Sequence, residues 1–144
     1  MTKKFNVQVD DFVKKATGLQ EKFIRQFIQD LFYEIVTTTP VDTGFARGSW
    51  YVGINDTDIE HQLGISREAA KQQGVQIDWS LQLSTSSLNI NSAKIGDKIY
   101  LMNNANYIMK LEYGASSQAP NGMVRVALSK IDSIAQAVAA RIIK

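Results

Sequence analysis

The residues with the clearest potential for chemistry are Asp42, Thr43 and Gly44, which stand together in the sequence. Aspartic proteases place this tripeptide on a tight turn, where the carboxyl group shares a proton with that of a second aspartate. The chain has one copy of the tripeptide, so proteolysis would require a homodimer. In those proteases a hydrophobic strand precedes the turn, whereas here the polar residues 37–39 follow a predicted helix. A structural turn, with hydrogen bonds to local backbone and unusual dihedral angles at Gly44, is the simpler interpretation.

Other catalytic or ligand-binding patterns are weak. The single histidine, His61, has Asp58 and Glu60 nearby, but their spacing is not typical of metal ligands. No serine stands in a glycine-flanked nucleophile turn, and no phosphate-binding glycine loop with a lysine is present. We therefore predict no catalytic residue, no cofactor and no metal site.

The composition argues against several classes of protein. The chain has 144 residues, of which 16 are basic and 14 acidic, so it lacks the positive excess typical of proteins that bind nucleic acid as their main ligand. It has no cysteine, which excludes disulfides and thiolate metal sites and suits a reducing compartment. No apolar stretch approaches the ~20 residues of a membrane span, and we expect neither a signal peptide nor contact with a membrane.

Hydrophobic periodicity predicts the elements that position the turn. Apolar residues recur at helical spacing over residues 12–36, and Gly18 predicts a break near the start of that helix. The three threonines at 37–39 and Pro40 predict its end.

Alternation, turn residues and caps predict further strands and helices. Strands are predicted at residues 49–55, 75–84 and 99–102. Helices are predicted at 67–73, with Ser66 as N-cap and Gly74 as stop, at 107–113, and as a closing helix over 124–142. Residues 85–93 are predicted as loop.

These elements predict an α+β fold, in which an antiparallel sheet packs against a long N-terminal helix and a C-terminal helix. We expect one domain over residues 1–144, with a long polar connection at about 56–74 that is mobile in the free protein. One core should contain the apolar residues Phe27, Leu31, Trp50, Trp79 and Leu128.

Three phrases of the sequence stand out together. They are Thr39–Gly44 followed by Arg47, Ser49 and Trp50; Asn103–Tyr107 running to Leu111–Gly114; and Gln118–Arg125. In this order they resemble the bacteriophage minor tail, tail-completion or neck proteins that join head and tail. The resemblance spans about residues 37–130, and the long polar stretch at 56–74 departs from it.

This resemblance implies a structural virion protein without catalysis, assembled in the bacterial cytoplasm. Its implied partners are further copies of itself in a ring of six, the portal or head-completion proteins, and tail-tube or tail-terminator proteins; the basic N-terminal helix adds a transient contact with passing DNA. The residues it implies as structural signatures are Pro40, Asp42, Thr43, Gly44, Trp50, Tyr107, Glu112, Gly114, Pro120 and Gly122. The homodimeric aspartic protease built on Asp42 stays open as the alternative.

Overall fold

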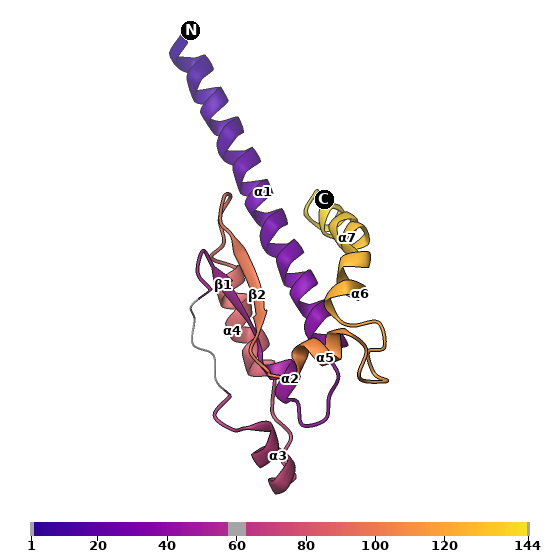
Figure 1. Cartoon of the computed structure of the whole chain (residues 1–144). Helices are drawn as coiled ribbons and strands as arrows, with labels where there is room; N and C mark the ends of the chain where they lie inside the picture. Colours follow the sequence, from indigo (N-terminus) through magenta and orange to yellow (C-terminus); the bar gives the residue numbers. More distant parts are fainter. Residues whose placement is uncertain (1, 58–62, 144) are drawn as a thin grey trace.

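A computed structural model describes residues 2–57 and 63–143 and is dominated by one long helix, α1 (Thr2–Thr38). The C-terminal half of α1 lies between the two strands on one side and the last two helices on the other, whereas its N-terminal half projects away from the body (Figure 1). The predicted break at Gly18 is wrong, because α1 is continuous. One glycine costs about 1 kcal/mol relative to alanine, which the helical residues on either side offset.

The sheet has two antiparallel strands, β1 (Trp50–Ile54) and β2 (Ile99–Asn103). Their register pairs Trp50 with Asn103 and Ile54 with Ile99. The first was predicted from alternation over 49–55 and the second from the short apolar run at 99–102, and both predictions are confirmed.

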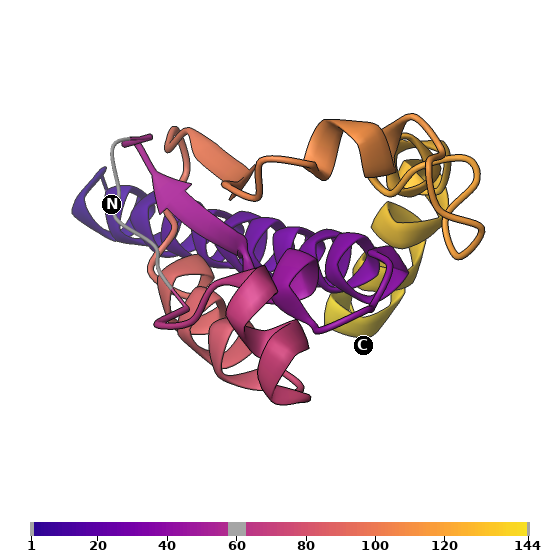
Figure 2. The same ribbon diagram turned by 60° about the horizontal axis from the view of Figure 1, so that its bottom comes forward.

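The third predicted strand, at residues 75–84, is wrong. Residues 75–78 are irregular and α4 (Ser80–Ile90) follows, so the loop predicted at 85–93 is largely helix as well. The half-buried Leu83 and the buried Ser86 and Ile90 have helical spacing, but the serine breaks the apolar pattern by which a helix is recognised in a sequence. Gln29 of α1 donates a hydrogen bond of 2.7 Å to the hydroxyl of Ser87, which gives this polar helix a partner. Figure 2 shows α4 lying beside α1.

Five further helices complete the described structure. They are α2 (Phe45–Gly48), α3 (Arg67–Gln73), α5 (Ile108–Glu112), α6 (Val124–Ser129) and α7 (Ile131–Ile143). The prediction for α3 is confirmed with its caps: Ser66 accepts a hydrogen bond from the N–H of Ala69, and Gly74 ends the helix with φ of 64°. The single closing helix predicted at 124–142 is instead two helices, because Lys130 leaves helical geometry.

The core forms where α1, β1, α4 and α6 meet. Leu31 and Trp50 are buried there, and Phe27 and Trp79 pack against them, as predicted. Leu128 is 52% exposed, so its prediction is wrong. Its neighbour Ala127 occupies the core-facing position of α6 instead, because successive helical residues point about 100° apart.

The architecture is α+β, as expected, with helices packed against an antiparallel sheet. None of the helices in the described part of the chain is long and apolar enough to cross a membrane. The predicted polar connection at 56–74 lies partly outside the described residues, at 58–62, and its second half contains α3.

Candidate functional site

The turn that follows α1 is the centre of the candidate site. Gly44 has φ of 84°, and a Cβ placed there would lie 2.6 Å from the carbonyl oxygen of Ile77. The N–H of Ile77 donates a 2.7 Å hydrogen bond to the carbonyl of Thr43. The residue after Thr43 must therefore be glycine both for its dihedral angles and for the close approach of a second chain segment. The unusual dihedral angles predicted at Gly44 are confirmed.

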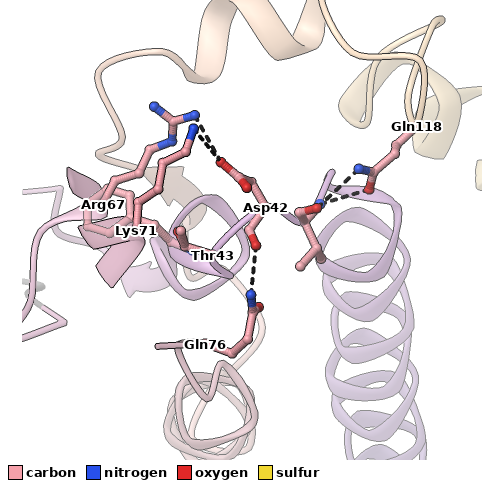
Figure 3. Close-up of polar contacts among 8 residues, drawn as sticks. Asp42, Thr43, Arg67, Lys71, Gln76 and Gln118 are labelled. Atoms are coloured by element: carbon pink, nitrogen blue, oxygen red, sulfur yellow. Dashed lines mark hydrogen bonds and ion pairs between the residues drawn. The ribbon is translucent and has the colours of Figure 1, made fainter. Parts of the chain in front are cut away.

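Asp42 contacts the helix α3, which lies beside the turn (Figure 3). Its carboxylate is 3.2 Å from Arg67 and 3.6 Å from Lys71. The side chain of Gln76 donates to the backbone carbonyl of Asp42 at 2.9 Å. The Asp42 side chain is 55% exposed, and exposed ion pairs of this kind contribute less than about 1 kcal/mol each. These contacts orient α3 against the turn more than they stabilise the fold.

Buried hydrogen bonds fix the end of α1 just before the turn. The Thr39 hydroxyl donates to the carbonyl of Ile35 at 2.7 Å and accepts from the indole N–H of Trp50 at 2.8 Å. Arg47 donates to the carbonyls of Thr39 and Thr37 at 2.8 and 2.6 Å, so a cation caps the helix C-terminus. Burial lowers the pKa of Arg47, but an arginine remains charged at neutral pH.

A long-range pair of hydrogen bonds ties the turn to the loop at 115–122. The side-chain carbonyl of Gln118 accepts from the N–H of Val41 at 2.9 Å, and its amide group donates to the carbonyl of Val41 at 3.1 Å (Figure 3). One glutamine therefore pairs with both backbone groups of Val41, as a neighbouring strand would.

Glu112 organises the start of α6. Its carboxylate accepts hydrogen bonds of 2.8, 3.0 and 3.0 Å from the backbone N–H groups of Met123, Val124 and Arg125. The guanidinium of Arg125 also donates to this carboxylate and stacks on Tyr113, 5.4 Å from the ring centre. Burial raises the pKa of Glu112, but the hydrogen bonds from these N–H groups and from Arg125 outweigh it, and the net pKa lies below its ordinary value.

Two glycines let the loop approach α5 closely. Gly114 has φ of 90°, and a Cβ there would lie 2.5 Å from the carbonyl oxygen of Pro120. Gly122 has φ of 86°, and a Cβ there would overlap the carbonyl oxygen of Glu112. The signature glycines are thus required for packing, as is Gly44.

A polar cleft of about 390 Å³ lies between the turn and the 115–118 loop. Its walls include Asp42, Arg67, Tyr107 and Gln118. The guanidinium of Arg67 lies 4.9 Å from the centre of the Tyr107 ring, so it contacts both the ring and the Asp42 carboxylate.

The predicted signature residues thus fall into two neighbouring groups. The first lies around the turn and contains Pro40, Asp42, Thr43, Gly44, Trp50 and Tyr107. The second lies around Glu112 and contains Gly114, Pro120 and Gly122. Sequence reasoning missed three side chains that contact Asp42, namely Arg67, Lys71 and Gln76; the helical periodicity of α3 gave no signal that it packs on the turn.

Among the described residues, no cluster of three or more histidine, cysteine or acidic side chains could hold a metal ion. His61, Asp58 and Glu60 lie outside those residues. Comparisons with models of protein families, with curated proteins and with solved structures found no match.

Proposed function

We propose that this chain is a structural virion protein that completes the tail of a long-tailed bacteriophage and joins it to the head at the neck. The observation that carries the proposal is spatial. The three phrases that resemble neck and tail-completion proteins are far apart in the sequence, yet hydrogen bonds join the first to the third, through Val41 and Gln118, and the second to the third, through Glu112 and Met123.

The chemistry of this region supports a role in assembly. The Asp42 carboxylate pairs with two cations, and the Glu112 carboxylate accepts hydrogen bonds from backbone and arginine. Both acidic groups are thereby used to hold chain segments together. An aspartic protease would instead need the Asp42 carboxylate to share a proton with a second one.

In this proposal the protein acts without catalysis as a closed ring of six copies, each touching two neighbours. It contacts portal or head-completion proteins on one side and tail-tube or tail-terminator proteins on the other. DNA that passes through the ring makes transient contact with it. The protein is assembled in the cytoplasm of the host bacterium and ends in the virion.

Imaging of particles tests the proposal directly. Reconstruction of the neck should contain density for this fold in a sixfold ring, and particles made without the protein should accumulate as unjoined heads and tails. Intact, joined particles in its absence would contradict the assembly role.

Asp42→Asn separates this function from the alternative, a homodimeric protease. We expect joined particles to form normally and the free energy of unfolding to change by less than about 1 kcal/mol, because the ion pairs are exposed. If the purified protein has a peptidase activity and Asp42→Asn abolishes it, the protease alternative is correct and the assembly role is wrong.

A further inference from the structure

The N-terminal half of α1 projects beyond the body of the protein (Figure 1). Two apolar side chains on it, Val13 and Leu19, are 53% and 44% exposed. A helix of this length is only marginally stable in water without a partner along its apolar side. The projecting half therefore needs a surface that this copy of the chain does not provide.

The sequence of this half indicates what kind of surface it fits. Apolar residues stand at positions 5, 9, 12, 16, 19 and 23, which are separated by steps of four and three residues in alternation. This 3.5-residue spacing is the seam of a coiled coil, which packs against another helix. The partner it calls for is an α-helix with the same kind of seam.

An apolar groove continues this seam where α1 enters the body. The groove has a volume of about 430 Å³ and is lined on α1 by Leu19, Phe23 and Ile24. Its walls are Ile95 on one side and the end of α7, with Ile142 and Ile143, on the other. Ile95 and Ile143 are 46% and 78% exposed, so the groove is open to solvent.

We propose that two copies of this protein pair through α1 in antiparallel orientation, so that the projecting half of each helix occupies the groove of the other. Both unpartnered surfaces are then covered by one contact. The groove is open to solvent, and the projecting half is a helix with no other described element beside it (Figure 1). A parallel pair would bring the two bodies to the same end, with the walls of one groove facing those of the other.

The seam also sets the register. All six seam positions find a partner when residue 16 of one copy lies opposite residue 12 of the other, residue 19 opposite 9 and residue 23 opposite 5. The twofold axis then passes near residue 14. This arrangement puts the two copies of Thr38 about 70 Å apart along the helices, so the Asp42 turns lie at opposite ends of the dimer. The pairing goes beyond the proposed function and does not depend on it: it is a state of the free protein, and the twofold contact must separate before six copies close a ring through head-to-tail contacts.

Sedimentation of the purified protein over a range of concentrations tests the pairing. We expect a reversible monomer–dimer equilibrium that Leu19→Glu weakens at least tenfold. Leu88→Glu is the matched control, because Leu88 is 73% exposed on α4, away from the groove, and its replacement should leave the equilibrium unchanged. A wild-type protein that stays monomeric, or a Leu19→Glu variant that dimerises like the wild type, would overturn the proposal.

Spin labels test whether the two helices are antiparallel. Because the chain has no cysteine, a single introduced cysteine carries the only label. Labels at Val13→Cys should lie close together in the dimer, whereas labels at Tyr33→Cys should lie between about 50 and 60 Å apart, given a rise of ~1.5 Å per residue. Tyr33 is 56% exposed and tolerates a label. Short distances at both positions would indicate a parallel pair and overturn the proposal. If the purified protein does not dimerise, the test of the neck function on particles is unaffected. A failure of the pairing can therefore be told apart from a failure of the proposed function.

Discussion

At the scale of single residues, the two carboxylates of the site, those of Glu112 and Asp42, should contribute different amounts to the stability of the fold. The Glu112 side chain is 14% exposed and holds three N–H groups, whereas the Asp42 side chain is 55% exposed. Removing one partner of a buried hydrogen-bonded charge leaves the others unsatisfied, which is costly. Glu112 is therefore the acidic residue on which stability should depend most.

Glu112→Gln should lower the free energy of unfolding at pH 7 by about 1 to 3 kcal/mol. The pKa of Glu112 is lower in the folded state, so its contribution is fully present above the ordinary value of 4.5 and is lost as the pH falls through the folded value. Urea unfolding at pH 7 and pH 3 should show a smaller difference between wild type and variant at pH 3. Glu68→Gln, an exposed change on α3, is the control; an equal effect of both changes would contradict the assignment.

Gly44→Ala and Gly74→Ala form a matched pair at this scale. Both glycines have positive φ, 84° and 64°, but a Cβ at Gly74 meets nothing within 4 Å, whereas at Gly44 it meets the carbonyl of Ile77. In thermal melts, Gly74→Ala should lower the free energy of unfolding by about 1 kcal/mol, from the backbone conformation alone. Gly44→Ala should lower the free energy of unfolding by clearly more, because its Cβ also meets the carbonyl of Ile77. Equal losses would show that the turn and residue 77 are not in tight contact.

At the scale of elements, the C-terminal half of α1 carries the core while its N-terminal half does not. Leu31 is 9% exposed and belongs to the buried cluster. Leu31→Ala should therefore cost about 2 to 5 kcal/mol in urea melts, from lost burial and the cavity left behind. Leu88→Ala, at an exposed position of α4, should cost less than about 0.5 kcal/mol. A loss that small at Leu31 would mean that α1 is not packed as described.

At the scale of the whole molecule, α1 holds the elements of the core together, since it contacts α4, α6 and α7 and α4 contacts β1. A single core predicts a single cooperative unfolding transition. Tryptophan fluorescence, which reports on Trp50 and Trp79 in and against that core, should therefore coincide with the calorimetric transition. Two separated transitions would show that the chain has more than one cooperative unit.

The sequence by itself determined the elements whose signals are local. Apolar periodicity predicts the long helix and the two strands, the threonines at 37–39 predict the end of the long helix, and Gly74 predicts the end of α3. Each of these signals acts between residues that are close in the sequence. The glycines of the turn and of the 114–122 loop were also recognisable by type, since few other residues adopt positive φ.

Which elements meet became known from the folded chain alone. Residues 75–84 alternate as a strand would, yet α4 begins within them, because packing of its buried positions against α1 and β1 outweighs local propensity. The contacts of Asp42 with Arg67 and of Val41 with Gln118 join residues 25 and 77 positions apart. Side-chain hydrogen bonds over such separations leave no periodic trace in the sequence, so only the folded chain reveals them.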